Sequence, residues 1–204
     1  NIIKQITDSI IQIDNVTLLD VDPGADTNRT VVTFVGPPES VVDAAFLAIK
    51  KASEILNMEE HKGAHARMGA TDVCPFVPVS GVTMEECIDL SVELASKVGK
   101  ELGIPIFLYE NSATSSERVN LANIRSGEYE GMGDKLKTKI WKPDFGPSTL
   151  HKRAGVTAIG AREFLIAYNI NLNSCEKKIA SDIALDVREA GRAKRDNKGK
   201  FVRE

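Results

Sequence analysis

The feature that most constrains the fold is a recurring unit, in which a short β-rich run ends at glycine or proline and an amphipathic helical pattern follows. Residues 30–35 (TVVTFV) read as a strand closed by a Gly-Pro-Pro turn, and residues 41–56 then show the length and apolar stripe of a helix. Two further β-rich runs, 73–79 (VCPFVPV) and 104–109 (IPIFLY), enclose a second helical pattern. Strands that alternate with helices predict α/β layers with a mixed β-sheet.

The expected ends of these elements carry recognisable turn and cap residues. Thr83, with Glu86 three residues later, forms a capping box that opens a helix over residues 84–102, and Gly103 ends it. The two prolines within residues 73–79 remove donors from a strand ladder. That run is therefore expected to be an edge or bulged strand.

The rest of the chain divides into shorter expected elements. They are a helix over residues 2–13, a strand over 16–21, a helical stretch over 116–139 interrupted by Gly127, Gly131 and Gly133, a loop over 142–155, a strand over 162–172 and a helix over 176–191. A loop as long as the one over 142–155 is usually functional or disordered in a compact domain. The basic tail (RAKRDNKGK) is compatible with a solvated turn and with a phosphate-binding patch.

The composition argues against several classes of protein. A chain of 204 residues with 42% apolar content can fill a core. Its net charge of −3 and its dispersed charges give no footprint of nucleic-acid binding, and no apolar run approaches the length of a membrane span. The first ten residues lack the order of a signal peptide, and the three cysteines are too scattered for a disulfide frame or a zinc knuckle. We expect a cytoplasmic protein with neither a nucleic-acid nor a membrane partner.

Two of the three histidines, His61 and His65, stand four residues apart in the segment 61–79 (HKGAHARMGATDVCPFVPV). A zinc helix of the H-E-x-x-H type needs a glutamate and a helix former where this chain has Lys62 and Gly63. A phosphate cradle needs closely spaced glycines that lead into a helix, whereas the glycines here stand six residues apart and lead into a predicted strand. We expect no metal site in this segment.

Acid–base chemistry is the remaining interpretation, because a histidine ordinarily titrates near pH 6.5 and an irregular loop can present it to a cleft. For His61 and His65 a catalytic role and a plain structural role both stay open. Asp22, beside a Pro-Gly turn, can orient an imidazole or serve only as a turn carboxylate. The Asp-Phe-Gly tripeptide at 144–146 lacks the companion motifs of a kinase, so we assign it no magnesium.

Six segments, in the right order, resemble the glutamate formiminotransferase family, the folate-dependent enzymes of histidine breakdown. They are LLDVDPG (18–24), TNRTVVTFVGPPE (27–39), HKGAHARMGATDVCPFVPV (61–79), IRSGEYEG (124–131), PDFGPS (143–148) and GAREFLIAYNINL (160–172). The resemblance implies two lobes, each an α/β (α+β) sandwich with a mixed β-sheet and helices on its outer face, and a folate site between them. Residues 1–162 then form the N-terminal lobe, and residues 163–204 begin the C-terminal lobe.

The resemblance also implies an activity and its residues. The family moves the formimino group from N-formimino-L-glutamate to N5 of tetrahydrofolate, which is a co-substrate, and no metal is implied. The catalytic base falls on His65 and the aspartate that orients it on Asp22. The substrate carboxylates make His61, Arg67 and Arg29 candidate substrate-binding residues. The folate-binding loop falls on Gly146, Pro147, Ser148, Thr149, Leu150, His151, Lys152, Arg153, Ala154 and Gly155. A homodimer is expected.

The chain departs from the family pattern beside the histidine. Ala64 and Ala66 stand where the family usually has a glutamate and a proline, so we expect a less rigid loop. The family also has a strand before the position of Asn1 and continues its second lobe past that of Glu204. Two other functions stay open: formyl transfer between 5-formyltetrahydrofolate and glutamate by the same histidine, and a non-catalytic folate-binding module.

Overall fold

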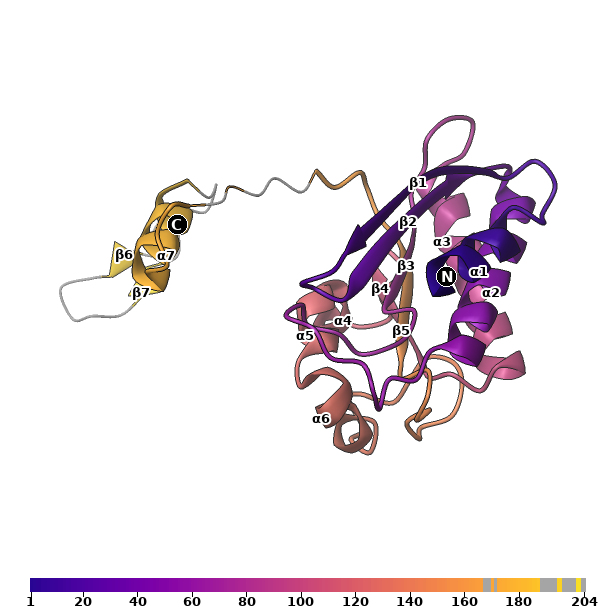
Figure 1. Cartoon of the computed structure of the whole chain (residues 1–204). Helices are drawn as coiled ribbons and strands as arrows, with labels where there is room; N and C mark the ends of the chain where they lie inside the picture. Colours follow the sequence, from indigo (N-terminus) through magenta and orange to yellow (C-terminus); the bar gives the residue numbers. More distant parts are fainter. Residues whose placement is uncertain (167–169, 171, 188–193, 196–200, 203–204) are drawn as a thin grey trace. The chain divides into compact units, whose positions relative to one another are not determined.

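The computed structural model of the chain describes residues 1–166, 170, 172–187, 194–195 and 201–202 (Figure 1). It divides into two compact units, Asn1–Phe164 and Leu165–Glu204. The division lies close to the boundary after residue 162 that the resemblance implies. That the second unit begins a further lobe remains a prediction.

The first unit contains most of the regular structure. Its helices are α1 (Ile2–Ile10), α2 (Pro38–Ile55), α3 (Met84–Glu101), α4 (Ser116–Val119), α5 (Leu121–Arg125) and α6 (Glu128–Lys135). Its strands are β1 (Thr17–Gly24), β2 (Arg29–Val35), β3 (Val73–Phe76), β4 (Ile106–Glu110) and β5 (Thr157–Ala161). The second unit contains α7 (Lys177–Val187), β6 (Lys194–Arg195) and β7 (Phe201–Val202). None of the helices in the described ranges is long and apolar enough to cross a membrane.

Two sheets build the first unit. Strands β1 and β2 form an antiparallel hairpin, and β3, β5 and β4 form a parallel sheet with β5 in the centre. The predicted sandwich of sheets and helices is confirmed, with antiparallel and parallel pairing found in separate sheets. Strand β3, which contains Pro75, lies at an edge, as the prolines of residues 73–79 predict.

The parallel sheet is buried on both faces, and β4 shows how. Ile106 and Leu108 point into a core with α2 and α3, whereas Phe107 and Tyr109 point into a second core with α5, α6 and Met68. This alternation follows from the pleat of a strand, in which successive side chains point to opposite faces. The second core matters for function because it supports the segment that carries the histidines.

Helix α3 begins and ends where the sequence predicts. The Thr83 hydroxyl accepts from the Glu86 N–H at 3.2 Å, and the Glu86 carboxylate accepts from the Thr83 N–H at 2.7 Å. Gly103 follows the helix with a φ of +64°, a left-handed conformation that suits glycine. The predicted capping box is confirmed.

The strand predicted over residues 162–172 is wrong as far as Ile166, and residues 167–169 and 171 lie outside the described residues. The strand instead occupies Thr157–Ala161, whose small residues gave little β signal. Gly160 is needed there because a Cβ would overlap the Tyr109 carbonyl oxygen on the neighbouring strand. The more apolar side chains that suggested a strand are exposed, with Ile166 at 90%.

Other predictions are corrected in detail. Gly127 precedes α6 with a φ of +89° and interrupts the helical stretch as predicted, but Gly131 and Gly133 lie inside α6. The helix predicted over 176–191 is found as α7, and residues 188–191 lie outside the described part of the chain. Most of the basic tail also lies outside it, so both of its interpretations stay open.

Gly155 holds two loops together and yields a test of the fold. Its φ is +70°, and a Cβ there would overlap the Met68 carbonyl oxygen, whereas Gly81 has a φ of +69° with open space around it. We expect Gly81→Ala to lower the free energy of unfolding by about 1 to 2 kcal/mol from the left-handed backbone alone. Gly155→Ala should lower it further because of the overlap. Equal losses in urea denaturation would contradict this account of the close approach.

Candidate active site

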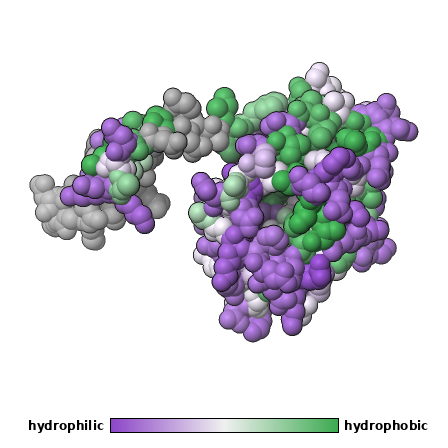
Figure 2. Space-filling view, viewed as in Figure 1, coloured by the Kyte–Doolittle hydropathy of each residue, from purple (hydrophilic) through white to green (hydrophobic). Residues whose placement is uncertain are grey.

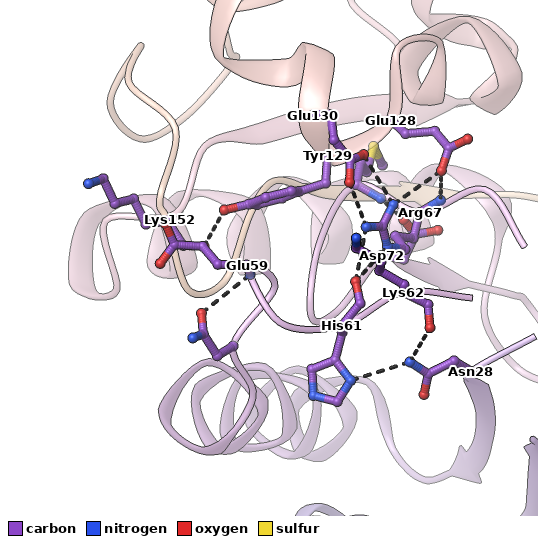
Figure 3. Close-up of polar contacts among 12 residues, drawn as sticks. Asn28, Glu59, His61, Lys62, Arg67, Asp72, Glu128, Tyr129, Glu130 and Lys152 are labelled. Atoms are coloured by element: carbon purple, nitrogen blue, oxygen red, sulfur yellow. Dashed lines mark hydrogen bonds and ion pairs between the residues drawn. The ribbon is translucent and has the colours of Figure 1, made fainter. Parts of the chain in front are cut away.

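Both predicted histidines lie on an irregular segment between α2 and β3, with the β1–β2 turn on one side and the first turn of α6 on the other (Figure 3). Gly63 lets the segment approach the hairpin, because a Cβ there would overlap the Thr27 carbonyl oxygen. The Ala64 N–H donates to the Asp26 carbonyl oxygen at 3.3 Å. The segment is therefore held by backbone contacts as well as by side chains.

The hydrogen bonds of His65 define its protonation pattern. Nδ1 lies 2.6 Å from the Ala66 carbonyl oxygen, which can only accept, so Nδ1 carries the proton. Nε2 lies 2.7 Å from Nη1 of Arg29, which can only donate, so Nε2 offers its lone pair. His65 is half-buried, so Nε2 is the atom placed to accept a proton.

Asp22 lies on the exposed face of β1, opposite Val31 of β2. The hydrogen bonds of both His65 nitrogens go to Ala66 and Arg29. The hairpin residue that contacts the imidazole is therefore Arg29, and orientation of His65 by Asp22 remains a prediction.

His61 is fixed mainly through its backbone. Its carbonyl oxygen accepts from Arg67 Nε at 3.1 Å and from Nη2 at 2.9 Å. Its Nδ1 lies 3.3 Å from the side-chain amide nitrogen of Asn28, which also donates to the Lys62 carbonyl oxygen at 2.7 Å. His61 thus connects the hairpin turn to Arg67, and its substrate-facing role stays a prediction.

Arg67 uses all five of its side-chain N–H donors within the protein. Besides the His61 carbonyl, Nη1 contacts Glu128 at 3.2 Å, and both carboxylate oxygens of Glu130 accept, the shorter contact being 2.8 Å to Nη2. The hydrogen bond to Glu130 raises the pKa of Arg67 and, reciprocally, lowers the pKa of Glu130. In this arrangement Arg67 has no donor left for a substrate carboxylate.

The predicted folate-binding loop lies beside the histidine segment. Its first residues, from Gly146 to Thr149, are exposed, and Ala154 and Gly155 are buried. The Ala70 N–H donates to the Ala154 carbonyl oxygen at 2.8 Å, and the Tyr129 hydroxyl donates to the Lys152 carbonyl oxygen at 2.7 Å. The structure therefore brings together two segments that are about 85 residues apart in the chain.

A buried ion pair fixes the chain just before this loop. Arg118 and Asp144 contact each other at 2.6 Å, with side-chain exposures of 8% and 10%. Asp144 also accepts from the Leu108 N–H at 2.9 Å, which attaches it to β4. The Asp-Phe-Gly tripeptide is thus a structural anchor.

An open surface cavity of about 520 Å³ lies between the histidine segment and α6. It is lined by Lys62, Gly63, Arg67, Gly127, Glu128 and Glu130. His65 is not part of this lining, so this cavity and the predicted base do not coincide. We give more weight to the base, because the carboxylates in the hollow are already paired with Arg67.

The surface around the site is uneven in polarity. Figure 2 shows hydrophilic side chains over the region of α4–α6 and hydrophobic ones over the hairpin, where Leu19 and Val31 are 59% and 45% exposed. Within the described residues, no three His, Cys, Asp or Glu side chains lie close enough together to hold a metal ion.

The first unit is an α/β sandwich in which the segment of His65 contacts the predicted folate-binding loop. The chain belongs to the formiminotransferase family, because residues 1–162 match the formiminotransferase domain, N-terminal subdomain. This finding agrees with the resemblance seen in the sequence.

Three relatives illustrate the similarity. The chain is 53% identical to a formimidoyltransferase-cyclodeaminase of Dictyostelium discoideum, with 94% of this chain and 35% of the relative covered. It is 51% identical to a glutamate formimidoyltransferase of Streptococcus pyogenes serotype M1 (88% and 60% covered) and 47% identical to one of Thermoplasma acidophilum (91% and 62%). The chain thus spans between about a third and three fifths of these curated relatives' length.

Sequence reasoning missed several residues that the structure brings to the site. They are Asn28, in the hairpin turn, and Glu128, Tyr129 and Glu130, which open α6. Arg29 was predicted as a substrate-binding residue, but its contact with His65 was not. The available signal was the segment IRSGEYEG, which contributed to the resemblance but received no role.

The ion pair of Glu130 yields a pH-dependent test. Its pKa is lowered from 4.5 in the folded state, so its stabilising contribution is complete above about pH 5 and is lost as the pH falls through the lowered pKa. We expect the free energy of unfolding of the wild type to exceed that of Glu130→Gln by a constant amount above about pH 5 and by less at lower pH. Urea unfolding across pH measures this, and a difference independent of pH would contradict it.

Proposed function

We propose that the protein transfers the formimino group from N-formimino-L-glutamate to N5 of tetrahydrofolate, in histidine degradation. The observation that carries this proposal is that His65, whose Nδ1 faces a carbonyl oxygen and whose Nε2 faces a donor, lies in the segment that contacts the end of the loop assigned to folate, through Ala70 and Ala154. Membership of the formiminotransferase family and the names of the relatives support it.

The chemistry requires a group that takes a proton and returns it. N5 attacks the amidine carbon, and the tetrahedral intermediate must then expel the glutamate nitrogen. Nε2 of His65 accepts the proton from N5 as the new bond forms and donates it to the departing nitrogen. A positioned acid–base group contributes about 10²- to 10⁴-fold in rate, and holding two substrates together contributes several kcal/mol more.

Arg29 must leave Nε2 before the imidazole can act in this way. A guanidinium and a carboxylate form strong, often bidentate, hydrogen bonds, so a carboxylate of formiminoglutamate is a suitable partner for Arg29 once it has moved. Lys62, Lys152 and Arg153 are further cations for the carboxylates of the two substrates, and the exposed residues Gly146 to Thr149 offer backbone groups to folate.

We also propose the compartment of the protein, the cover of its exposed apolar residues and its partners. The scattered free cysteines suit a cytoplasmic protein. The exposed apolar residues of the hairpin support a homodimer or a further lobe as a cover. The proposed partners are the two small-molecule substrates.

The direct test is purified full-length protein mixed with formiminoglutamate and tetrahydrofolate, followed by absorbance for 5-formiminotetrahydrofolate. A parallel reaction with 5-formyltetrahydrofolate and glutamate measures formyl transfer. Turnover of the formyl pair alone would replace the proposed donor, and tight folate binding with no turnover of either pair would identify a binding module.

His65→Ala should lower kcat by about 10²- to 10⁴-fold while tetrahydrofolate binding persists, because only the proton relay is removed. His61→Gln is the matched control in the same segment and should have a much smaller effect. Steady-state kinetics and equilibrium binding measure the two quantities. An unchanged kcat in His65→Ala would remove this residue from the mechanism.

Asp22→Asn tests the proposed orienting role. If Asp22 contacts the imidazole when substrates are bound, the amide will favour the wrong tautomer and slow turnover, with substrate binding less affected. Asp20→Asn, on the same strand, is the control. Equal kcat values for the two variants would show that Asp22 has no part in orienting His65.

A further inference from the structure

The first turn of α6 has an unusual backbone. Gly127 has a φ of +89°, and Glu128, which follows it, has a φ of +51°. A non-glycine residue in the left-handed region is uncommon and costs free energy, so the surrounding contacts must maintain it. At this turn those contacts reach both loops of the candidate site.

The turn contacts the histidine segment through Arg67. The Tyr129 N–H donates to the Arg67 carbonyl oxygen at 2.9 Å, and the carboxylates of Glu128 and Glu130 accept from the Arg67 guanidinium. The same guanidinium donates twice to the His61 carbonyl oxygen. A chain of direct contacts therefore runs from α6 to the start of the segment that carries His65 (Figure 3).

The turn contacts the predicted folate loop through the next side chain. The Tyr129 hydroxyl donates to the Lys152 carbonyl oxygen at 2.7 Å, and the ring spans the space between α6 and that loop (Figure 3). Glu130 and Tyr129 are adjacent in the chain. The same helical turn therefore reaches the histidine segment through Glu130 and the predicted folate loop through Tyr129.

We infer that the turn Gly127–Glu130 is a positioning element that sets the histidine segment and the folate loop relative to each other. The inference rests on the proposed function, because it assigns those two loops their roles. Glu130 acts through Arg67 on the segment of His65, and Tyr129 acts through Lys152 on the folate loop. None of these side chains takes part in the chemical step.

A purely stabilising role fits the contacts less well. Glu128 and Glu130 are 46% and 62% exposed, and ion pairs at exposed carboxylates contribute little to stability. The histidine segment has alanines on both sides of His65, so it depends on external contacts for its geometry. A displacement of about 1 Å at a reacting group can cost about 10²-fold in rate.

The test separates the contact of the turn with Arg67 from its contact with the folate loop through Tyr129. Arg67→Met should lower kcat by about 10- to 100-fold with little change in KM for either substrate. Glu130→Gln, which keeps a neutral acceptor, should lower kcat by about 3- to 10-fold. Tyr129→Phe should instead raise the KM for tetrahydrofolate by about 3- to 10-fold and leave kcat nearly unchanged.

Asp134→Asn is the matched control. Asp134 also lies in α6, and the substitution removes its exposed ion pair with Lys137, just past the end of the helix, a pair that reaches neither loop. It should leave kcat and both KM values unchanged. Arg67→Lys adds a second comparison, because it restores the charge but not the forked geometry. It should recover the thermal stability lost in Arg67→Met without recovering kcat. If kcat follows thermal stability across these variants, the positioning role is overturned.

A readout without catalysis keeps this inference distinct from the proposed function. In Arg67→Met, hydrogen exchange of backbone amides should become faster at residues 61–66 but not at residues 148–153. In Tyr129→Phe, it should become faster at residues 148–153 but not at residues 61–66. An inactive wild type with these exchange changes would reject the proposed function alone. An active wild type whose variants show unchanged kinetics and exchange would reject the positioning role alone.

Discussion

The candidate site depends on one close approach of two backbones. Gly69 and Gly155 form a bridge, and the hydrogen bonds on either side run from Val156 to Met68 at 3.0 Å and from Ala70 to Ala154 at 2.8 Å. A Cβ on either glycine would overlap a carbonyl oxygen of the opposite segment. This contact joins the histidine segment to the predicted folate loop just before β3 and β5 pair, so the parallel sheet fixes both loops at one place.

The interactions around this approach divide into two kinds. The Arg118–Asp144 pair is almost fully buried, and loss of either partner would leave an unpaired charge in the protein interior. The Arg67 contacts lie closer to solvent and hold geometry more than they stabilise the fold. The buried pair therefore fixes the start of the predicted folate loop, and the more exposed contacts determine how the histidine segment lies against α6.

Much of the fold was predictable from local chemistry. The capping box at Thr83 and Pro75 of β3 act within a few residues, so their consequences could be read directly. Strand β5 was missed because its central place depends on small residues that let β4 approach, which is a tertiary requirement. The same reason explains α6, where packing keeps Gly131 and Gly133 helical against their low propensity.

The site likewise combines features that the sequence predicts with contacts that depend on the tertiary structure. The resemblance located His65 and the folate loop, but it gave no sign that Arg67 is fully engaged within the protein or that the turn of α6 contacts both loops. Those facts depend on which atoms meet across about 60 residues of chain, and charge alone does not specify them. A cation in a motif predicts that a carboxylate is nearby without saying whether the protein or the substrate supplies it.

On the proposed mechanism, the contact between Arg29 and His65 would link substrate choice to catalysis. As long as Nε2 accepts from the guanidinium, the imidazole cannot take a proton, so the base acts only when another acceptor draws Arg29 away. A carboxylate competes well for a guanidinium, because it carries the opposite charge and can accept two parallel N–H bonds, whereas an imidazole nitrogen offers one lone pair. A formimino donor with a free carboxylate can thus draw Arg29 away from Nε2 of His65, whereas a neutral analogue of the same shape cannot. If His65 is the base, this arrangement favours an acidic amino-acid derivative for a physical reason that is independent of the family to which the chain belongs.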